Sequence, residues 1–443
     1  MRSNSVSPAR LTAFEILRRV EDGAYASVLL AVKEEMLKPA DRALAHELVQ
    51  GILRRQFFLD QLIQHFSNRS PDSLDQAVRI SLRLGLYQLR FLDRIPPSAA
   101  VNESVNLTRR ARIRSAEGFV NAVLRRADRE RDYDPIAESS DPIDRLALET
   151  SHPHWLLKRW TTAFGFDFAA AFARANNEVP PVAFRVVKGV EDEAEVLENL
   201  KASGGNIARS KVATSAWVLQ GSPRKLLELA KQGKVYIQDE ASQLAAEIVA
   251  AEASDKVLDV CAAPGSKASQ LAGADHRFEV IAGDVNEARL RTVADTIELH
   301  RLTNVRCVVM DGLRDFPFKE ESFDTVFVDA PCSGTGTLRR NPEIRWRISA
   351  ADIQDLSARQ SQILTNAARS VATGGRLIYS TCSVEPEENE KVLRAFLDSN
   401  QQFEQLEPRT SPALLTAEKT VRTWPQIHGS DGFFVGVLGR KAN

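Results

Sequence analysis

Apolar residues recur at helical spacing through the first 130 residues of the chain. Leu44, Leu48 and Ile52 follow one another at four-residue intervals, and a run between residues 74 and 89 keeps a similar period. Prolines at positions 71, 96 and 97 interrupt these runs, because proline cannot donate a backbone hydrogen bond inside a helix. The pattern predicts an all-helical bundle over residues 1–135.

A turn-rich acidic stretch follows this bundle. Residues 131–146 read RDYDPIAESSDPIDRL, with two Asp-Pro pairs and a Ser-Ser pair, a composition that favours an exposed connection between domains. Beyond it, residues 151–235 mix helical runs with the strand-like segments VAFRVV and SAWVLQ. This part is expected to be a small α+β module.

From residue 236 onward, short apolar runs alternate with segments of helical period. Such alternation indicates a parallel sheet with helices on both faces, in a Rossmann-like α/β arrangement. The candidate strands are residues 256–260, 279–284, 304–311, 323–330, 375–382 and 433–439. The chain is therefore expected to be multidomain, with an all-α N-terminal bundle, the small α+β module and an α/β domain over residues 236–443.

Charge is distributed unevenly, although the formal net charge of the 443 residues is only −1. Residues 1–130 hold 21 Lys and Arg against 15 Asp and Glu, so the helical part is basic and the rest of the chain is acidic. A basic domain attached to a larger body is typical of nucleic-acid binding, and a solvated helix face is the alternative. The candidates for phosphate contact in this part are Arg109, Arg110, Arg112 and Arg125.

The cysteine content and the lack of long apolar runs indicate the cellular compartment and exclude some kinds of site. The four cysteines, Cys261, Cys307, Cys332 and Cys382, form no C-x-x-C pair, which argues against a disulfide framework or a zinc site. The N-terminus lacks an apolar run of signal-peptide length, and no segment approaches the roughly 20 apolar residues of a membrane span. We expect a cytoplasmic monomer without a bound metal and without a membrane partner.

Parallel sheets bind ligands beyond the carboxyl ends of their strands, so the residues that follow each strand are candidate site residues. The first strand runs into the loop CAAPGSK, where Gly265 permits close approach of the backbone to a ligand. Asp284 ends the second strand 19 residues after this glycine, near the offset at which a carboxylate meets a ribose hydroxyl. Asp311 ends the third strand, where a carboxylate can accept from an adenine amino group. Together they indicate a nucleoside-containing cofactor, with loop-capping carboxylates as the alternative.

Two cysteines stand beyond adjacent strands of the predicted sheet. Cys332 follows the fourth strand shortly after Asp329, and Cys382 ends the fifth. Desolvation, a nearby cation and helix N-termini can tune thiol reactivity at such a position, so both thiols are candidate catalytic groups. Cys307, in the middle of the third strand, is expected to be a small buried apolar residue.

Three segments in this order resemble the motifs of S-adenosylmethionine-dependent RNA cytosine-C5 methyltransferases: DVCAAPGSK, DAPCSGTGTLRRNPEIRW and STCSVEPEENE. The N-terminal segments LRLGLYQLRFL, PPSAAVNESVNL and GFVNAVLRRA resemble the helical RNA-binding domain of the NusB family. The pairing of these two parts is similar to that in bacterial methyltransferases of 16S ribosomal RNA, over nearly the whole chain. The resemblance implies methyl transfer from S-adenosyl-L-methionine to C5 of a cytosine in 16S ribosomal RNA.

The resemblance also implies a role for each motif residue. Asp284 would hold the ribose hydroxyls of the cofactor and Asp311 its adenine side. Cys382 would be the nucleophile that attacks C6 of the cytosine, Cys332 would assist release of the product, and Asp329 would serve both the cofactor region and the base. The cofactor loop would be formed by Cys261, Ala262, Ala263, Pro264, Gly265, Ser266 and Lys267.

Two positions depart from the family pattern. Ser266 replaces the usual second glycine of the cofactor loop, which a serine tolerates if its φ is negative. Val187 replaces the usual asparagine after the double proline, which puts in doubt whatever contact that asparagine makes.

The motif that contains Cys332 continues into a basic cluster with one aromatic residue. Arginine and tryptophan side chains suit phosphate contact and base stacking, although packing of the tryptophan in the core is the alternative. The candidates are Arg339, Arg340, Arg345 and Trp346. Because a base must be unstacked before a thiol can reach C6, the RNA target is expected to be a loop-like region.

The sequence leaves two other functions open. The catalytic motifs are shared across the family, so transfer RNA is an alternative substrate, and only the helical N-terminal part favours ribosomal RNA. A ribosome assembly factor that binds RNA with weak or no catalysis is the second alternative. The intact Asp329, Cys332 and Cys382 argue against it.

Overall fold

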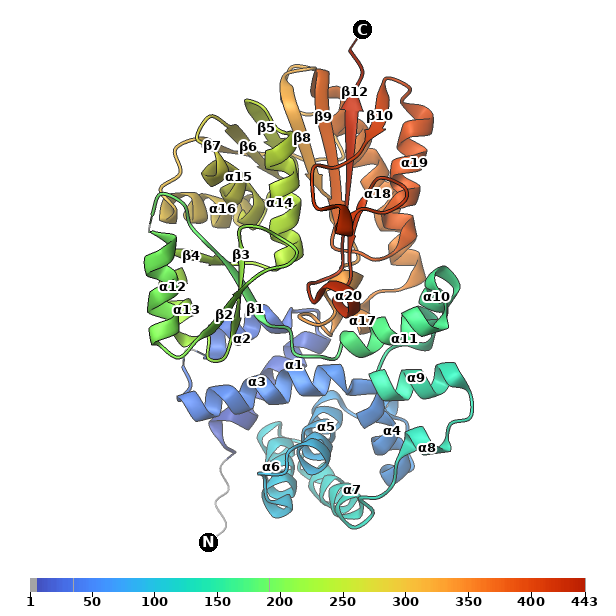
Figure 1. The fold of residues 1–443 in the computed structure, drawn as a ribbon. Helices are drawn as coiled ribbons and strands as arrows, with labels where there is room; N and C mark the ends of the chain where they lie inside the picture. The colour runs from blue at the N-terminus through green and yellow to red at the C-terminus, as the bar shows by residue number, and fades with distance from the viewer. Residues whose placement is uncertain (1–5, 35, 191, 443) are drawn as a thin grey trace. The chain divides into compact units, whose positions relative to one another are not determined.

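The chain folds into two compact units. The computed structural model describes residues 6–34, 36–190 and 192–442. Met1–Glu178 and Leu338–Arg347 form one unit, and Val179–Thr337 and Ile348–Asn443 form the other (Figure 1). We call them the helical unit and the sheet unit. Within the described ranges, no helix is both long enough and apolar enough to span a membrane.

The helices of residues 8–129 surround one apolar core, as the helical period predicts. In α5, for example, the Asp75 side chain caps the N-terminus by accepting the N–H of Ala77, and the periodic Val78, Leu82 and Leu86 are buried. The helices of the helical unit are α1 (Pro8–Glu21), α2 (Ala26–Glu34), α3 (Pro39–Arg54), α4 (Gln56–Ser67), α5 (Gln76–Phe91), α6 (Pro97–Arg110), α7 (Glu117–Arg129), α8 (Pro135–Glu138), α9 (Pro142–Thr150), α10 (His154–Phe164), α11 (Phe166–Ala175) and α17 (Ile344–Arg347).

Residues 131–146, predicted as an exposed connection, are mostly exposed, but they contain α8 and the first turns of α9 and lie within the helical unit. The two Asp-Pro pairs begin α8 and α9. Asp134 and Asp141 each accept backbone N–H groups of the first turn, and the following proline lacks only an N–H that would have no partner in the helix. Asp-Pro starts helices as well as turns, and composition alone does not distinguish the two.

A four-stranded antiparallel sheet in the order β2-β3-β1-β4 opens the sheet unit. β1 and β3 are the two predicted strand-like segments, whereas the short outer strands β2 and β4 were not predicted. The elements are β1 (Val182–Val186), α12 (Glu193–Ala202), β2 (Asn206–Arg209), β3 (Ala216–Gln220), α13 (Arg224–Lys231) and β4 (Val235–Ile237). The division between the units runs inside the predicted module 151–235, because α10 and α11 pack in the helical unit.

The larger sheet has eight strands in the order β10-β12-β9-β8-β5-β6-β7, with β11 paired to β12. All six predicted strands form, and β5 to β9 run parallel. The sheet is mixed rather than parallel throughout, because β12 returns antiparallel beside β9 and pairs with the unpredicted β10 and β11. The strands are β5 (Lys256–Asp259), β6 (Glu279–Asp284), β7 (Val305–Val309), β8 (Phe323–Asp329), β9 (Val371–Thr381), β10 (Phe403–Leu406), β11 (Val421–Thr423) and β12 (Phe433–Arg440).

Cys307 corrects one expectation from the sequence. The residue lies in β7 as predicted, but its side chain is exposed. β7 is the last strand of the sheet and pairs only with β6 along the strand order. An edge strand buries less of its surface than a central one, so mid-strand position does not place this thiol in the core.

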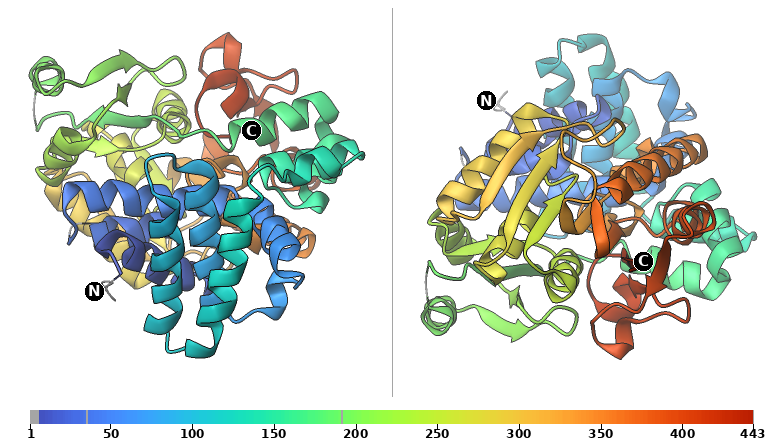
Figure 2. Two further views of the ribbon diagram at one scale, coloured as in Figure 1. Left: turned by 90° about the horizontal axis from the view of Figure 1, so that it is seen from below. Right: turned by 90° about the horizontal axis from the view of Figure 1, so that it is seen from above.

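Helices cover both faces of the larger sheet, so its core has two layers. α14 (Glu240–Glu252), α15 (Ser266–Ala274) and α16 (Glu287–Leu299) share one apolar cluster with Val257 of β5. α18 (Ala350–Arg369) and α19 (Glu390–Ser399) share the other cluster with the next residue of that strand (Figure 2). Side chains of a strand alternate between faces, and the parallel strands end at one edge. That edge carries the candidate site.

Candidate active site

Gly265 turns the chain from β5 into α15 at the carboxyl edge of the sheet. Its φ is +101°, and a Cβ at this position would lie 3.1 Å from Cα of Val293 on α16. The close approach and the positive φ both require glycine. Ser266 is the first residue of α15, and its φ is not positive. A serine is therefore tolerated where the family usually has glycine. The predicted cofactor loop therefore ends in the first N–H groups of α15, which have no acceptor within the helix.

Asp284 ties the loop after β5 to the loop after β6. Its buried carboxylate accepts the N–H of Ala263 at 3.3 Å through Oδ2 and that of Asn286 at 2.9 Å through Oδ1. Asp311, just beyond β7, is half-buried and accepts the N–H of Leu313 at 3.0 Å. Both carboxylates cap loops, as the alternative interpretation holds, and carboxylate oxygens have further lone pairs for a ligand. Their contacts with a cofactor stay a prediction.

Lys267 and Asp329 form an ion pair between the cofactor loop and the end of β8. Lys267 Nζ lies 2.7 Å from Asp329 Oδ2, and Ser380 Oγ donates to the other carboxylate oxygen at 2.7 Å. Burial alone would lower the pKa of Lys267, but the surrounding negative groups, Asp329 first and then Cys382 and Asp259, together outweigh burial and raise it. The sequence placed Lys267 only in the cofactor loop, and its partner was not predicted.

Asp259, at the end of β5, was not singled out from the sequence. Neither of its carboxylate oxygens has a hydrogen-bond partner among the described residues, and the residue is 1% exposed. Burial first, and then the charge of Asp329, raise the pKa of Asp259 to about 8, while Lys267 opposes the rise. The signal available in the sequence is its position, because an acidic residue ends the first strand just before the glycine loop.

This edge fits the predicted cofactor. S-adenosyl-L-methionine carries a sulfonium cation and an adenosine, so it suits a site with acidic side chains and a loop of close backbone approach. Asp259 supplies a buried acceptor without a partner among the described residues. Gly265, which has no side chain, lets the backbone come close to a ligand. Lys267, Asp284 and Asp311 complete the set of polar residues that would hold it.

The two candidate thiols lie together beyond β8 and β9. Cys332 Sγ and Cys382 Sγ are 3.2 Å apart, and both residues are half-buried. The hydrogen bond with Cys382, followed by burial, raises the pKa of the Cys332 thiol well above its usual range. Burial and the charge of Asp259 also raise the pKa of Cys261. The sequence placed two thiols at this edge, and the structure adds that their sulfur atoms are in contact.

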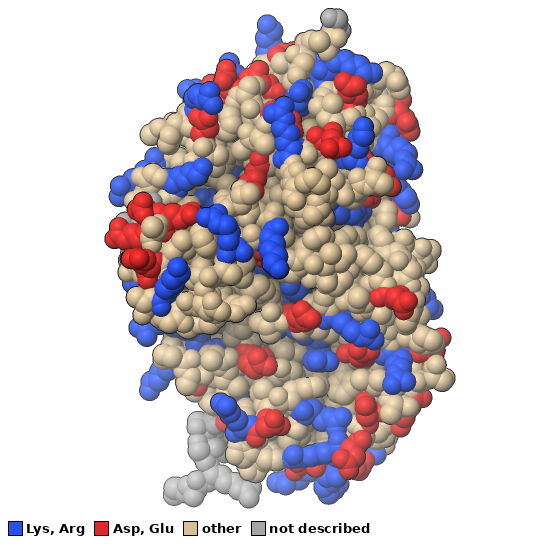
Figure 3. All heavy atoms as spheres, in the orientation of Figure 1, with Lys and Arg blue, Asp and Glu red and all other residues tan. Residues whose placement is uncertain are grey.

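The predicted arginine cluster of the helical unit is mostly exposed. Arg110, Arg112 and Arg125 are solvent-exposed, whereas Arg109 pairs with Glu117 at 2.6 Å. On the face drawn in Figure 3, Lys and Arg side chains lie among Asp and Glu side chains rather than in one basic patch. Phosphate contact by these arginines stays a prediction.

The segment Leu338–Arg347 does not present its arginines as the sequence suggested. Arg345 is fully buried, and its guanidinium donates to the carbonyls of Thr150, Ser151 and Asn176. Burial lowers the pKa of Arg345 to about 9. The guanidinium of Arg345 donates to carbonyls at the C-terminus of α9 that have no partner within the helix. It therefore stabilises the helical unit and does not face a ligand.

The neighbouring residues of this segment are also inside the helical unit. Arg339 is buried and Arg340 is half-buried. Arg347 donates to carbonyls at the end of α1, among them that of Gly23 at 3.1 Å. Trp346 is half-buried with its ring centroid 6.3 Å from that of Phe57, which corresponds to the alternative of core packing. For Arg345 the sequence signal was misleading, because arginine also binds carbonyls at helix C-termini. RNA contact by Arg340 and Trp346 stays a prediction.

Family comparisons match all three parts of the chain. Residues 246–439 match the family described as 16S rRNA methyltransferase RsmB/F, and residues 7–129 match the NusB family. Residues 152–224 match the ferredoxin-like domain described for RsmF/B-like methyltransferases. The helical bundle, the small α+β module and the Rossmann-like domain predicted from the sequence are thereby confirmed.

Individual relatives are similar over the full length. A probable ribosomal RNA small subunit methyltransferase B of Bacillus subtilis is 34% identical, with 100% of each chain covered. The ribosomal RNA small subunit methyltransferase B of Cronobacter sakazakii is 33% identical, with 99% of each chain covered. Among solved structures, the crystal structure of PH0851 superposes with a TM-score of 0.86 at 26% identity, covering 98% of this chain and 99% of that one.

Proposed function

The chain belongs to the family of S-adenosylmethionine-dependent ribosomal RNA small-subunit methyltransferases, and we propose that it methylates C5 of one cytosine in a loop-like region of 16S ribosomal RNA. The observation that carries this proposal is the contact between Cys332 Sγ and Cys382 Sγ, 3.2 Å apart. RNA methylation at an exocyclic or ribose oxygen or nitrogen needs no thiol, whereas carbon methylation of a pyrimidine does. Two thiols at the cofactor edge therefore favour C5 of cytosine.

The reaction proceeds through a covalent adduct. C5 of cytosine is a poor nucleophile, and attack of the Cys382 thiolate at C6 forms a C6–S bond that places electron density on C5. S-adenosyl-L-methionine, when bound, supplies an electrophilic methyl group. Once C5 carries this methyl group, a base takes the C5 proton and the C–H electrons form the C5=C6 double bond as the C6–S bond breaks. The electron pair of the C6–S bond returns to the sulfur of Cys382.

The environment of the two thiols supports different roles for them. The hydrogen bond with Cys382 and then burial raise the pKa of the Cys332 thiol, so this thiol holds its proton 3.2 Å from the other sulfur atom. The ammonium group of Lys267 interacts electrostatically with Cys382. Cys382 is therefore assigned as the nucleophile, and Cys332 is assigned to protonation steps at product release.

Asp329 is assigned to the target base. Its carboxylate is held from both sides, by Lys267 Nζ and by Ser380 Oγ, each at 2.7 Å. A carboxylate fixed in this way can accept from the exocyclic amino group of cytosine and so hold the ring in place for attack at C6. Preorganised groups of this kind stabilise a transition state because they need no rearrangement during the reaction.

The choice of RNA rests on the helical unit and on the relatives. The match to the NusB family covers residues 7–129, and the full-length relatives carry names that specify small-subunit ribosomal RNA. Ribosomal RNA as substrate implies that the enzyme works in the bacterial cytoplasm. Transfer RNA is the alternative substrate that the shared catalytic motifs permit.

The test is methyl transfer from labelled S-adenosyl-L-methionine to unmodified 16S ribosomal RNA and, in parallel, to unmodified transfer RNA. Nucleoside analysis is expected to find 5-methylcytidine in the ribosomal RNA, at a single position. Preferential labelling of transfer RNA would overturn the choice of substrate. Cofactor binding without transfer to either RNA or to small-subunit particles would favour an assembly factor.

A further inference from the structure

One buried carboxylate joins the two loops that carry the catalytic cysteines. Glu388, in a short 3-10 turn before α19, is fully buried. Ser333, the residue after Cys332, donates its backbone N–H to Glu388 Oε1 at 2.8 Å and its hydroxyl to Oε2. Ser383, the residue after Cys382, donates its hydroxyl to the same Oε2. The cysteine-serine pairs of two separate motifs thus share one acceptor.

Further contacts fix this carboxylate in place. Gln360 Nε2 of α18 donates to Glu388 Oε1 at 3.0 Å and to the carbonyl of Pro331, just before Cys332, at 2.9 Å. The two serine hydroxyls are themselves 3.0 Å apart. The Tyr379 hydroxyl of β9 donates to the backbone carbonyl of Glu388. Because the side chains of Glu388, Ser333, Ser383, Gln360 and Tyr379 are buried, water competes little for the hydrogen bonds among them, and this part of the network is rigid.

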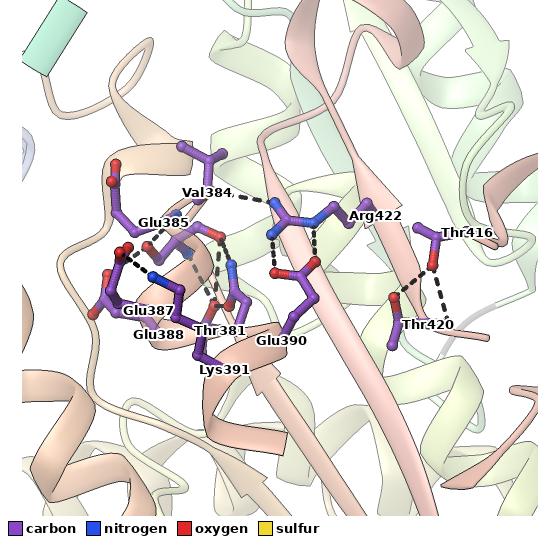
Figure 4. A network of polar contacts seen from close by, with 12 residues as sticks. Thr381, Val384, Glu385, Glu387, Glu388, Glu390, Lys391, Thr416, Thr420 and Arg422 are labelled. Carbon is purple, nitrogen blue, oxygen red and sulfur yellow. Dashed lines mark hydrogen bonds and ion pairs between the residues drawn. The ribbon is translucent and has the colours of Figure 1, made fainter. Parts of the chain in front are cut away.

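The peptide that bears Glu388 is braced from the opposite side. The Arg422 guanidinium of β11 makes two bonds of 2.7 Å to the carboxylate of Glu390 and a third to the carbonyl of Val384 (Figure 4). The Thr381 hydroxyl, at the end of β9, donates to Oδ1 of Asn389. The loop from Cys382 to α19 therefore closes on itself, with Glu388 at its centre.

We propose that Glu388 is a positioning residue for the proposed methyl transfer: its carboxylate holds the two cysteine loops together through the serines that follow the cysteines. Each cysteine is followed in the chain by a serine that donates to Glu388. Because both serines bind the same carboxylate, Glu388 sets the distance between the two sulfur atoms. Removing the acceptor releases both loops at once.

The charge of Glu388 has a second effect on the thiols. The groups that act on Cys332 are Cys382, which is its hydrogen-bond partner, then Glu388 and Asp329, whose negative charges raise the pKa of its thiol. Tyr379 also interacts with Cys332 electrostatically. A like charge nearby disfavours the thiolate, so Glu388 opposes ionisation of Cys332. This differs from a purely structural role and can be measured apart from turnover.

The matched pair of variants is Glu388→Gln and Glu387→Gln. Glutamine at position 388 keeps the size of the side chain and one acceptor but loses the charge. Position 387 is the adjacent acid, whose side chain pairs with Lys391 toward solvent at 2.7 Å, so it controls for loss of one negative charge. We expect Glu388→Gln to lower kcat by about 100-fold with KM for S-adenosyl-L-methionine unchanged, because misplaced reacting groups cost about that much. Glu387→Gln is expected to retain the parental kcat.

A thiol measurement tests the same inference without RNA or cofactor. In a Cys382→Ser background, the pH dependence of Cys332 alkylation by iodoacetamide is followed by peptide mass spectrometry. Glu388→Gln is expected to lower the midpoint by roughly one pH unit, and Glu387→Gln is expected to leave it in place. An unchanged midpoint together with unchanged kcat overturns the proposal. Because no substrate is present, a failure of the proposed methyl transfer would leave this profile intact.

Two serine variants cover the case in which Glu388→Gln does not fold. Ser333→Ala and Ser383→Ala each remove one side chain from the shared acceptor. If Glu388 acts as a common tie, the double variant loses little more kcat than the more damaging single variant, since effects in one network are not additive. Fully additive losses would show that the two loops are positioned independently and would overturn the inference.

Discussion

Lys267 Nζ lies 2.7 Å from Asp329 Oδ2, so a lysine of the cofactor loop holds the carboxylate assigned to the target base. The two residues are separated by 62 positions in the sequence and belong to different motifs. This ion pair therefore connects cofactor binding to base binding. Any change at Lys267 is expected to affect both.

Lys267→Met is expected to lower kcat by about 100-fold or more, because it removes the cation that fixes the carboxylate assigned to hold the target base. It is also expected to weaken binding of S-adenosyl-L-methionine, since the loop loses its tie to β8. Calorimetric titration and steady-state kinetics measure the two effects. Normal cofactor affinity together with normal kcat would show that the ion pair is only structural.

Asp259 is expected to make stability depend on pH in a specific direction. Its pKa is about 8 in the folded protein and near 4 in the unfolded chain, so the folded state binds more protons between these values. The linkage relation then requires that stability falls as pH rises through this window. Asp259→Asn cannot ionise, so the advantage of this variant over the parent should grow from pH 5 to pH 9. Chemical denaturation across that range is the measurement, and a constant difference would contradict the assigned pKa.

Arg345 is expected to contribute to stability rather than to RNA affinity. Arg345→Met leaves the carbonyls of Thr150 and Ser151 and the side chain of Asn177 without this donor. Unsatisfied buried acceptors cost about 1–3 kcal/mol each in general, so the free energy of unfolding should fall by roughly that amount or more. Thermal unfolding and RNA filter binding separate the two roles. A variant of normal stability with lost RNA affinity would restore the interpretation from the sequence.

The exposed arginines are expected to behave in the opposite way. Charge neutralisation at Arg110, Arg112 and Arg125 leaves no buried acceptor behind, so thermal stability should be unchanged. If each contacts one phosphate, the slope of log affinity against log salt should decrease by about 0.7 to 0.9 per residue removed. An unchanged slope would assign these residues to a solvated helix face.

Long, regular patterns determined which elements could be predicted. Six strands of the larger sheet were found because each lies in a continuous apolar run next to a helical period; β5 has only four residues, but the run KVLDV extends beyond it. β10 and β11 have four and three residues, and β2 and β4 are equally short. Their residues form no long apolar run, and their pairing depends on distant segments. The helices α8 and α9 were missed for a different reason. The Asp-Pro dipeptide occurs both in turns and at the start of helices, so it does not distinguish the two.

The candidate site shows the same limit. Asp284, Asp329, Cys332 and Cys382 were identified because strand ends of a parallel sheet share one edge. Which side chains touch was not available from the sequence, so the partners of Lys267 and of Glu388 emerged only from the fold. Arg345 was misassigned because a basic residue near a catalytic motif has the same signature whether it binds phosphate or backbone carbonyls.

The proposed mechanism requires that Cys382 forms the covalent bond to RNA and that Cys332 allows its release. The most direct test incubates the Cys332→Ala variant with unmodified 16S ribosomal RNA and S-adenosyl-L-methionine, and maps any denaturant-stable RNA adduct by peptide mass spectrometry. Cys307→Ser, which changes the exposed cysteine of β7, is the matched control and should turn over normally.

We expect the Cys332→Ala variant to accumulate an adduct on the peptide that contains Cys382, and Cys382→Ala to form no adduct and no 5-methylcytidine. An adduct on any other residue, or near-normal methylation by Cys382→Ala, would contradict the assignment of the nucleophile.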